Sequence, residues 1–143
     1  MHVIDIEAKD LFQALSDLTR LRMLRVLVIT KAEACLCDFT EALGEPQYNL
    51  SRHLKILRQV GLVNAEKEGR WVYHGLIRGE LHIEKLYDLV ALLPDPNGFF
   101  SDDLKRMTKV IRSRSNTRCR KDALESSLKS VITKSRTRAS TKT

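Results

Sequence analysis

A short helix, a tight break and a second helix occupy the middle of the chain, and this order restricts the fold more than any other feature. Asp38 and Glu41 have the spacing of a capping box, which predicts a short helix over residues 38–43. Residues 44–47, Gly-Glu-Pro-Gln, end that helix because glycine tolerates the geometry of a helix terminus and proline cannot continue a helix. The two helices are therefore tightly linked.

The second helix is expected over residues 49–59, where apolar and polar positions separate onto two faces. Asn49 or Ser51 can cap its start, and Gly61 ends it. The inward face carries Leu50, Leu54 and Leu57. A major groove about 12 Å wide admits one helix, which needs a core-facing side and a polar side. The division of residues 49–59 is of this kind.

A β-hairpin is expected directly after the second helix. Residues 62–67 and 70–76 are β-prone runs on either side of a turn that contains Gly69. Helix, short turn, helix and hairpin is the order of a winged helix-turn-helix. The fold class that we expect is therefore mainly α with a small β-hairpin.

The polar face of the second helix and the tip of the hairpin supply the candidate DNA contacts. These candidates are Gln47, Asn49, Ser51, Arg52, His53, Lys55, Arg58 and Arg70. Arg52 and Arg58 can make forked contacts to guanine or phosphate, whereas Lys55 is a point charge. Arg70 can enter an adjacent minor groove. His53 either contacts DNA or packs, and packing or idle exposure is the more common use of such a histidine.

Apolar residues at helical spacing predict further helices on both sides of this unit. The first stripe consists of Ala8, Leu11, Phe12 and Leu15. A second helix, capped by Asp17 or Thr19, carries Leu21, Leu24, Leu27 and Val28. A long helix after the hairpin stops before Pro94 and carries Leu81, Ile83, Leu86, Leu89, Val90 and Leu93. Weaker stripes follow at Leu104, Met107, Val110 and Ile111, and at Leu124, Leu128, Val131 and Ile132.

The positive charge of the chain lies in its last third. The net charge is +7, yet residues 1–100 hold 12 Lys and Arg against 14 Asp and Glu, and residues 101–143 hold 13 against 4. We therefore expect a DNA-binding and dimerisation domain over residues 1–99 and a basic, partly helical extension over residues 100–143. The last ten residues are too polar to offset the entropy of ordering and are expected to be disordered. Such an extension either solubilises the chain or attracts phosphate.

Cys35 and Cys37 stand one residue apart, just before the predicted short helix. Residues i and i+2 inside a helix point about 200° apart, but at a strand-to-helix junction they can converge. A helix N-terminus also favours the thiolate, which binds soft ions rather than Mg²⁺ or Ca²⁺. Two cysteines are also often core residues, so the spacing by itself leaves both uses open.

Several stretches together resemble the arsenic-repressor family (ArsR/SmtB), which comprises small dimeric metalloregulators. The most specific set is Ser51-Arg52-His53-Leu54, followed by Leu57-Arg58 and Gly61-Leu62. The other matching stretches are residues 12–22, 35–39, 61–63 and 68–71. The resemblance covers about half of the chain, over residues 11–76.

This resemblance implies a homodimer whose first helix and post-hairpin helix pack across a two-fold axis. Our candidates for that interface are Leu11, Leu15, Leu86, Leu89 and Leu93. Two-fold symmetry would set two reading helices about 34 Å apart, on an imperfect palindrome in double-stranded DNA. The resemblance also implies a repressor that occludes a promoter and leaves it when a ligand binds.

Arsenite-responsive members of the family carry a C-x-C-x-x-C pattern, and Cys35 and Cys37 match its first two positions. Thr40 occupies the third position, so either two thiols suffice or the third comes from elsewhere. Cys119, within a basic segment, is the third candidate ligand. The expected inducer is arsenite or antimonite, with cadmium or lead as alternatives and no organic cofactor. The His/Asp pattern of the family's zinc sensors is not apparent, and His82 and Glu84 are more typical of a solvated surface.

Two other functions fit the same sequence. A redox switch would close a disulfide between Cys119 and Cys35 or Cys37, and an architectural DNA-binding protein would rely on the basic extension. An enzyme is not expected, because no nucleophile–base set, phosphate loop or H-E-x-x-H motif stands out. Unbroken apolar runs are short, four residues at 26–29 and five at 89–93, far short of a membrane span, and the first residues are acidic where a signal peptide is basic. We therefore expect a cytoplasmic protein.

Overall fold

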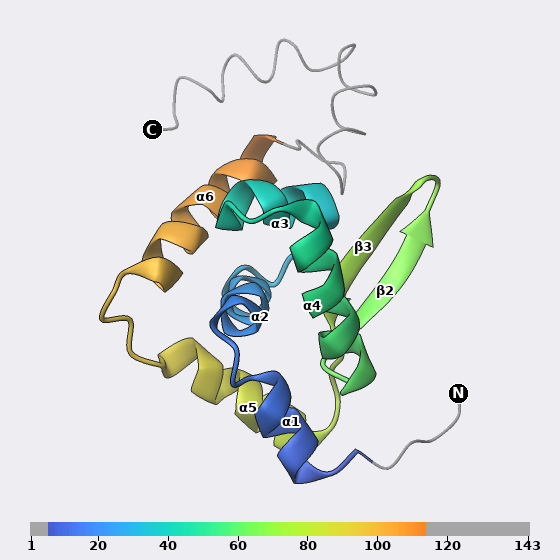
Figure 1. The fold of residues 1–143 in the computed structure, drawn as a ribbon, viewed down its shortest axis with the longest axis vertical. Coiled ribbons are helices and arrows are strands. Elements are labelled where there is room, and N and C mark those ends of the chain that lie inside the picture. The colour runs from blue at the N-terminus through green and yellow to red at the C-terminus, as the bar shows by residue number, and fades with distance from the viewer. Residues whose placement is uncertain (1–5, 114–143) are drawn as a thin grey trace.

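The computed structural model describes residues 6–113, and the helices and strands given below belong to that range. Helix α2 (Leu18–Thr30) lies at the centre of the molecule, and the other helices surround it (Figure 1). Helix α1 (Ala8–Ala14) precedes it, and α5 (Leu81–Leu92) and α6 (Phe99–Ser113) are the last two helices of the described range. Asp17 caps α2, as predicted, by accepting hydrogen bonds from the first backbone amides of the helix.

The helix-turn-helix consists of α3 (Leu36–Leu43) and α4 (Gln47–Gln59). Gly44 ends α3 with a φ of +72°, in the left-handed region that glycine adopts without a steric penalty. Pro46 then stands immediately before α4 as its N-cap. The short helix, tight turn and second helix that the sequence predicts are confirmed.

A three-stranded antiparallel sheet forms the wing. Strands β2 (Val63–Glu68) and β3 (Trp71–Leu76) pair as the predicted hairpin, with Val63 opposite Leu76. Strand β1 (Ala34–Cys35) pairs with the other edge of β3, which gives the order β1-β3-β2. The sequence does not predict β1, because two residues are too few to show the alternation of a strand.

Two helix caps differ from the sequence prediction. Cys35, and not Asp38, is the N-cap of α3, because the Asp38 carboxylate lies inside the helix and accepts from the backbone N–H of Cys35 over 3.1 Å. Helix α4 begins at Gln47, so neither Asn49 nor Ser51 caps it. The backbone oxygen of Pro46 accepts from the backbone N–H groups of Asn49 and Leu50, so the helix is already formed where these caps were expected.

The core forms between α2 and the inner face of α4. The three leucines predicted to face inward on α4 are confirmed there, each at most 2% exposed: Leu50, Leu54 and Leu57. Ala8 and Phe12 depart from the predicted stripe, since both are exposed, Phe12 over 63% of its surface. Leu11, Ala14 and Leu15 take up the inward face of α1, and Phe12 is turned away from it.

Helix α6 lies alongside α3 and α2 and belongs to the same folded body (Figure 1). Its predicted stripe is largely confirmed, because Met107 and Val110 are buried and Leu104 and Ile111 are partly buried. The domain boundary expected at residue 99 falls in the first turn of this helix. The stripe predicted over residues 124–132 and the expected disordered end lie outside the described residues. Within residues 6–113, no helix has the length and apolar character to cross a bilayer.

Candidate DNA-reading helix and thiol site

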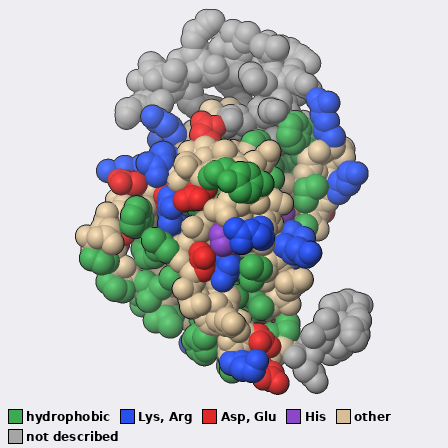
Figure 2. Space-filling model, in the orientation of Figure 1, with side chains coloured by type: hydrophobic (Ala, Val, Ile, Leu, Met, Phe, Trp, Pro, Cys, Tyr) green, Lys and Arg blue, Asp and Glu red, His purple; other side chains and the backbone are tan. Residues whose placement is uncertain are grey.

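Helix α4 presents a polar, basic face to the solvent. Of the eight predicted DNA contacts, five are exposed residues of this helix: Gln47, Ser51, Arg52, Lys55 and Arg58. Asn49 is half-buried, because its side-chain amide donates to Glu45 Oε1 over 3.1 Å. Figure 2 shows Lys and Arg side chains gathered over the part of the surface that α4 and the wing occupy in Figure 1. This face has the size and charge to enter a DNA groove.

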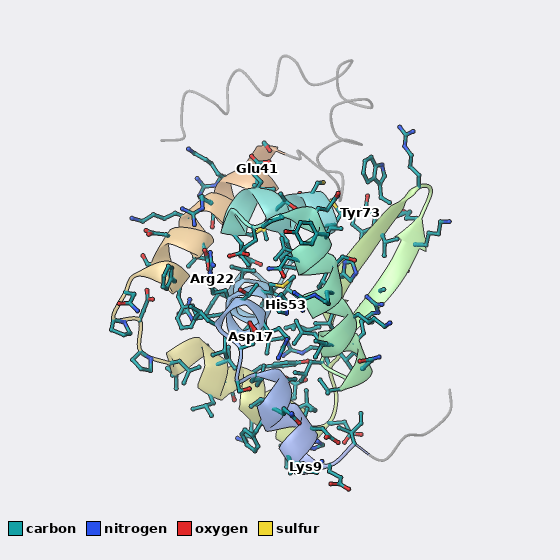
Figure 3. The ribbon with its side chains drawn as sticks, in the orientation of Figure 1. Lys9, Asp17, Arg22, Glu41, His53 and Tyr73 are labelled. Atoms are coloured by element: carbon teal, nitrogen blue, oxygen red, sulfur yellow. The ribbon has the colours of Figure 1, made fainter. Side chains whose placement is uncertain are left out.

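His53 does not belong to that face. Only 5% of its surface is exposed, and it lies between α4 and the central helix α2 (Figure 3). Its Nδ1 lies 3.0 Å from Nη1 of Arg20 on α2. The assignment of His53 as a DNA contact is therefore wrong for this conformation, and the packing alternative holds. Burial lowers the pKa of His53, with nearby Arg20 and Arg52 acting in the same direction and Asp17 against them.

Tyr48 is a surface residue of α4 that the sequence reasoning missed. It is the second residue of the helix, and 77% of its surface is exposed. The helical stripe offers no signal for it, because Tyr48 lies outside the leucine spacing and an isolated tyrosine is common in a core. An exposed aromatic ring with a hydroxyl group at the start of a groove-reading helix can contact a thymine methyl group or a phosphate.

Arg70 occupies the tip of the wing, as predicted. It is exposed, and its guanidinium carbon lies 5.6 Å from the centre of the Trp71 ring. Gly69 turns the chain there with a φ of +66°. The cation therefore rests against an aromatic face at the end of the hairpin, which is where a wing approaches DNA beside the reading helix.

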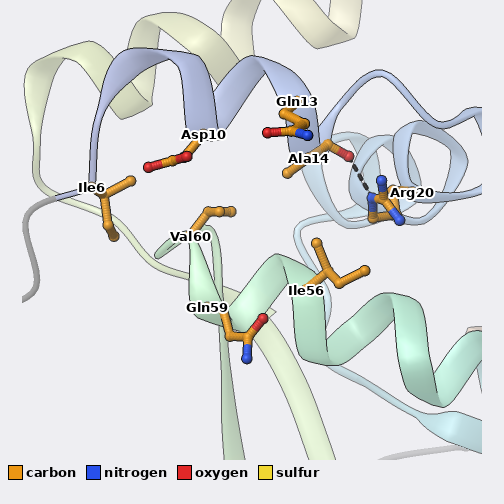
Figure 4. Close-up of a pocket in the computed structure, with 8 residues that line it drawn as sticks. All are labelled: Ile6, Asp10, Gln13, Ala14, Arg20, Ile56, Gln59 and Val60. Atoms are coloured by element: carbon orange, nitrogen blue, oxygen red, sulfur yellow. Dashed lines mark hydrogen bonds between the residues drawn. The ribbon is translucent and has the colours of Figure 1, made fainter.

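A hollow of about 370 Å³ separates α1 from the last turn of α4 (Figure 4). It is lined by Ile6, Asp10, Gln13, Ala14, Arg20, Ile56, Gln59 and Val60. Arg20 closes one end of it by donating from Nε to the backbone oxygen of Ala14 over 2.5 Å. Arg20 thus holds α1 on one side and His53 of α4 on the other.

Cys35 and Cys37 converge at the junction between β1 and α3. Their Sγ atoms lie 2.7 Å apart, because Cys35 is still extended as the N-cap while Cys37 is already helical. Cys35 is 2% exposed and Cys37 is half-buried, so the pair is reached from one side. The convergence expected for a strand-to-helix junction is confirmed.

Backbone and wing surround this pair of thiols. The Cys35 sulfur accepts from the backbone N–H of Asp38 within the capping box. Tyr73 stands opposite Cys35 in the sheet, and Trp71 packs against the same small cluster. A ligand atom from each of Cys35, Cys37 and Asp38 lies within 4.8 Å of the others. Two cysteine sulfurs this close together suit a soft, thiophilic ion better than Mg²⁺ or Ca²⁺.

Thr40, at the third position of the family's pattern, does not join the cluster. The hydroxyl of Thr40 donates to its own helix, at the backbone oxygen of Leu36 over 3.0 Å, and does not replace a thiol. Cys119 lies outside the described residues. Glu84 accepts from the backbone N–H of Gly79 and from the side chain of Arg78, and these bonds lower its pKa. Its carboxylate therefore stabilises the loop before α5.

The fold and this surface define a winged helix-turn-helix transcriptional regulator. The sequence model of the "Bacterial regulatory protein, arsR family" matches residues 17–65. An HTH-type transcriptional regulator of Methanocaldococcus jannaschii is 36% identical over 83 residues, which is 57% of this chain and 92% of that protein. The chain therefore belongs to the arsR family of bacterial regulatory proteins.

The chain is also similar to a second curated regulator and to a solved structure. The arsenical resistance operon repressor of Escherichia coli is 42% identical over 66 residues, which is 46% of this chain and 56% of the repressor. The chain thus spans little more than half of the length of that repressor. Among solved structures, HlyU from Vibrio cholerae matches with a TM-score of 0.50 and 34% identity, over 57% of this chain and 89% of HlyU.

Proposed function

We propose that this chain is a dimeric repressor of a palindromic promoter site, and that arsenite or antimonite releases it by bridging Cys35 and Cys37. The observation that carries this proposal is the 2.7 Å separation of the two sulfur atoms at the start of α3. Trivalent arsenic and antimony form strong bonds to thiolates. The E. coli relative is by name an arsenical resistance repressor, which supports the same ligand class.

The basic face of α4 is the proposed DNA-reading surface. Arg52, Lys55 and Arg58 all project from it, and Arg70 extends the positive surface along the wing. Arginine forks suit guanine edges and phosphates, and a lysine adds attraction to the backbone. A two-fold dimer would place two such helices in successive major grooves, about 34 Å apart.

A second copy of the chain would cover apolar side chains that α1 and α5 leave exposed. They are Phe12, Leu81, Leu89 and Leu92. Figure 2 shows hydrophobic side chains over the edge of the molecule that α5 forms in Figure 1. Of the five interface candidates from the sequence, Leu11 and Leu15 are buried in the chain's own core, and Leu86 and Leu93 pack partly against it. Leu89 alone of those candidates stays more than half exposed.

The position of the thiols explains how an ion bound between them would affect the DNA-reading helix. Cys35 is the last residue of β1 and the cap of α3, and α3 leads through a three-residue turn into α4. Tyr73 of the wing is paired with Cys35 on the other side. An ion held by the two sulfurs therefore acts on the helix-turn-helix and the wing at once. About 5.5 kcal/mol of differential affinity takes DNA occupancy from 99:1 to 1:99, which two or three sulfur bonds can supply.

Cys119 is the proposed third sulfur ligand. Thr40 does not supply one, since its hydroxyl is engaged within α3. Arsenite titration of Cys119→Ser tests this ligand, and a weakened response is expected. Thr40→Cys is the matched gain-of-thiol variant, in which the family's third position is restored and the response should tighten.

Thiol oxidation is the second candidate function. In that case Cys119 would form a disulfide with Cys35 or Cys37, and hydrogen peroxide would take up the two electrons and two protons to give two waters. Cadmium and lead remain alternative ions for the same site. A purely architectural DNA-binding role predicts no response to any of these agents and little sequence discrimination.

One release assay separates these functions. The full chain is first used to select a DNA duplex from a random library, here called the selected duplex. Its release is then measured with arsenite, antimonite, cadmium, lead, zinc and peroxide, for the wild type and for each cysteine-to-serine variant. Release by arsenite and antimonite supports the proposal, whereas release by peroxide alone identifies the redox switch.

A further inference from the structure

Asp103 of α6 is completely buried, and two arginines neutralise it. Nε and Nη2 of Arg22, on α2, donate to its two carboxylate oxygens, each over 2.8 Å. Nη2 of Arg106, one turn along α6, donates to Oδ1 over 3.2 Å. These bonds raise the pKa of Arg22, so its guanidinium stays charged although the residue is only 7% exposed.

Both arginines also donate hydrogen bonds to the C-terminal end of α3. Nη2 of Arg22 donates to the backbone oxygen of Leu43 over 2.9 Å, and Nε of Arg106 donates to that of Ala42 over 2.6 Å. The last carbonyls of a helix have no partner inside it and carry a partial negative charge. The two guanidinium groups therefore fix the end of α3 immediately before the turn into α4.

A chain of polar contacts continues from Arg22 to the surface of α4. Nη1 of Arg22 lies 3.6 Å from Oε2 of Glu45, in the turn. Glu45 Oε1 accepts from the side chain of Asn49 over 3.1 Å, and Asn49 Oδ1 accepts from Nη2 of Arg52 over 2.5 Å. Three side chains thus connect a buried carboxylate on the last described helix to an exposed arginine on the DNA-reading helix.

We propose that Asp103 is a positioning residue for DNA recognition, which holds α4 and the Arg52 side chain in their reading geometry through Arg22, Glu45 and Asn49. This inference rests on the proposed DNA-reading role of α4. Without the carboxylate, Arg22 and Arg106 are two neighbouring cations that repel one another. Arg22 then loses the bonds that orient it toward the helix-turn-helix.

The sign of the effect separates positioning from simple electrostatics. Removing a carboxylate from a DNA-binding protein raises its attraction for phosphate, so charge alone predicts tighter binding. Positioning predicts weaker binding to the selected duplex. Glu45→Gln also removes a negative charge, so charge alone again predicts tighter binding and positioning predicts weaker binding. Glu45 is half-exposed, and its replacement is not expected to unfold the protein.

The first experiment measures affinity for the selected duplex with the full chain. Asp103→Asn should bind about tenfold more weakly than the wild type. Asp102→Asn is the matched control, because Asp102 is an exposed residue of the same helix and the charge change is identical. Glu45→Gln should also bind more weakly. Equal affinity of Asp103→Asn and Asp102→Asn would overturn the proposal, as would tighter binding by Glu45→Gln.

A double variant distinguishes positioning from a stabilising ion pair. Replacing a buried ion pair by apolar side chains often preserves stability, so Arg22→Met with Asp103→Leu should regain the melting temperature that Asp103→Asn loses. Its affinity for the selected duplex should stay about tenfold below the wild type. Recovery of both stability and affinity would show that the pair only stabilises the fold.

Hydrogen exchange without DNA keeps this inference separate from the proposed function. The backbone amides of Asn49 and Leu50, which donate to Pro46 at the start of α4, should exchange about tenfold faster in Asp103→Asn than in Asp102→Asn. Unchanged exchange would contradict the positioning role. A wild type that discriminates no duplex would instead contradict the DNA-reading function and leave the exchange result to decide the role of Asp103.

Discussion

Arg20 of α2 donates a hydrogen bond to Nδ1 of the buried His53 on α4, over 3.0 Å. A guanidinium can only donate, so Nδ1 is the acceptor and the ring proton lies on Nε2. The neutral ring is therefore the form that joins α2 to α4. Protonation would remove the acceptor and place a second cation beside Arg20.

Acidification should destabilise the protein through His53. Burial is the main cause of its lowered pKa, so the unfolded chain binds a proton that the folded chain resists. The neutral His53 ring contributes to the free energy of unfolding above pH 6.5, the ordinary histidine pKa. This contribution is lost as the pH falls from 6.5 toward the lowered pKa of His53 in the folded protein. Urea denaturation of wild type and His53→Gln between about pH 7.5 and about pH 5.5 measures this. The free energy of unfolding of the variant should depend less on pH than that of the wild type. His74 is also buried and accounts for part of the dependence that remains. The same pH dependence in both proteins would contradict this role of His53.

Tyr87→Phe should destabilise the fold by about 1–3 kcal/mol. The hydroxyl oxygen of Tyr87 lies 2.8 Å from the backbone oxygen of Leu62 and 2.7 Å from that of Ile77, and burial raises its pKa to about 12. Its loss leaves two carbonyl groups at the base of the wing without this donor. Tyr48→Phe removes the same atom from an exposed side chain and should leave the free energy of unfolding unchanged. Equal denaturation midpoints for both variants would refute the role of the buried hydroxyl.

Arg52→Ala should weaken binding to the selected duplex by about 1–3 kcal/mol while leaving the assembly state intact. Arg52 is exposed on the reading face, and its bond to Asn49 orients the guanidinium. Lys85→Ala, on the exposed side of α5, removes the same charge away from that face. Fluorescence anisotropy at moderate salt compares them, and equal losses would indicate nonspecific attraction only.

Leu92→Glu should shift the chain from dimer to monomer. Leu92 is 80% exposed on α5, within the apolar surface assigned to the second copy. A charge buried in such an interface without a partner is costly. Val72→Glu makes the same chemical change on the wing, where 39% of Val72 is exposed, and should not alter the assembly state. Sedimentation velocity reports both, and a dimeric Leu92→Glu would place the interface elsewhere.

Local spacing was enough to predict the architecture around α4. The leucines at positions 50, 54 and 57 specify a helix with one buried face, and the glycine at 44 marks the turn that precedes it. The convergence of Cys35 and Cys37 was also predictable, because it needs only a helix start close to the two residues, although α3 begins at Leu36 and not at residue 38. These features are decided by contacts between near neighbours in the chain.

Long-range contacts explain what the sequence could not reveal. Arg22 looks like one of several surface arginines on α2, yet its carboxylate partner is 81 positions further along the chain. Strand β1 exists only because β3 offers an edge to it. His53 has the residue type of a DNA contact, and only its packing against Arg20 shows that it faces inward.

Arsenite titration of the full chain on the selected duplex tests the central claim most directly, with wild type and Cys37→Ser compared by anisotropy. Cys37 is the half-buried member of the pair, so its replacement by serine should preserve both the fold and DNA binding. The wild type should leave the duplex as arsenite is added, and Cys37→Ser should stay bound. Release of Cys37→Ser at the wild-type arsenite concentration would contradict the claim that a guest held between the two sulfurs drives dissociation.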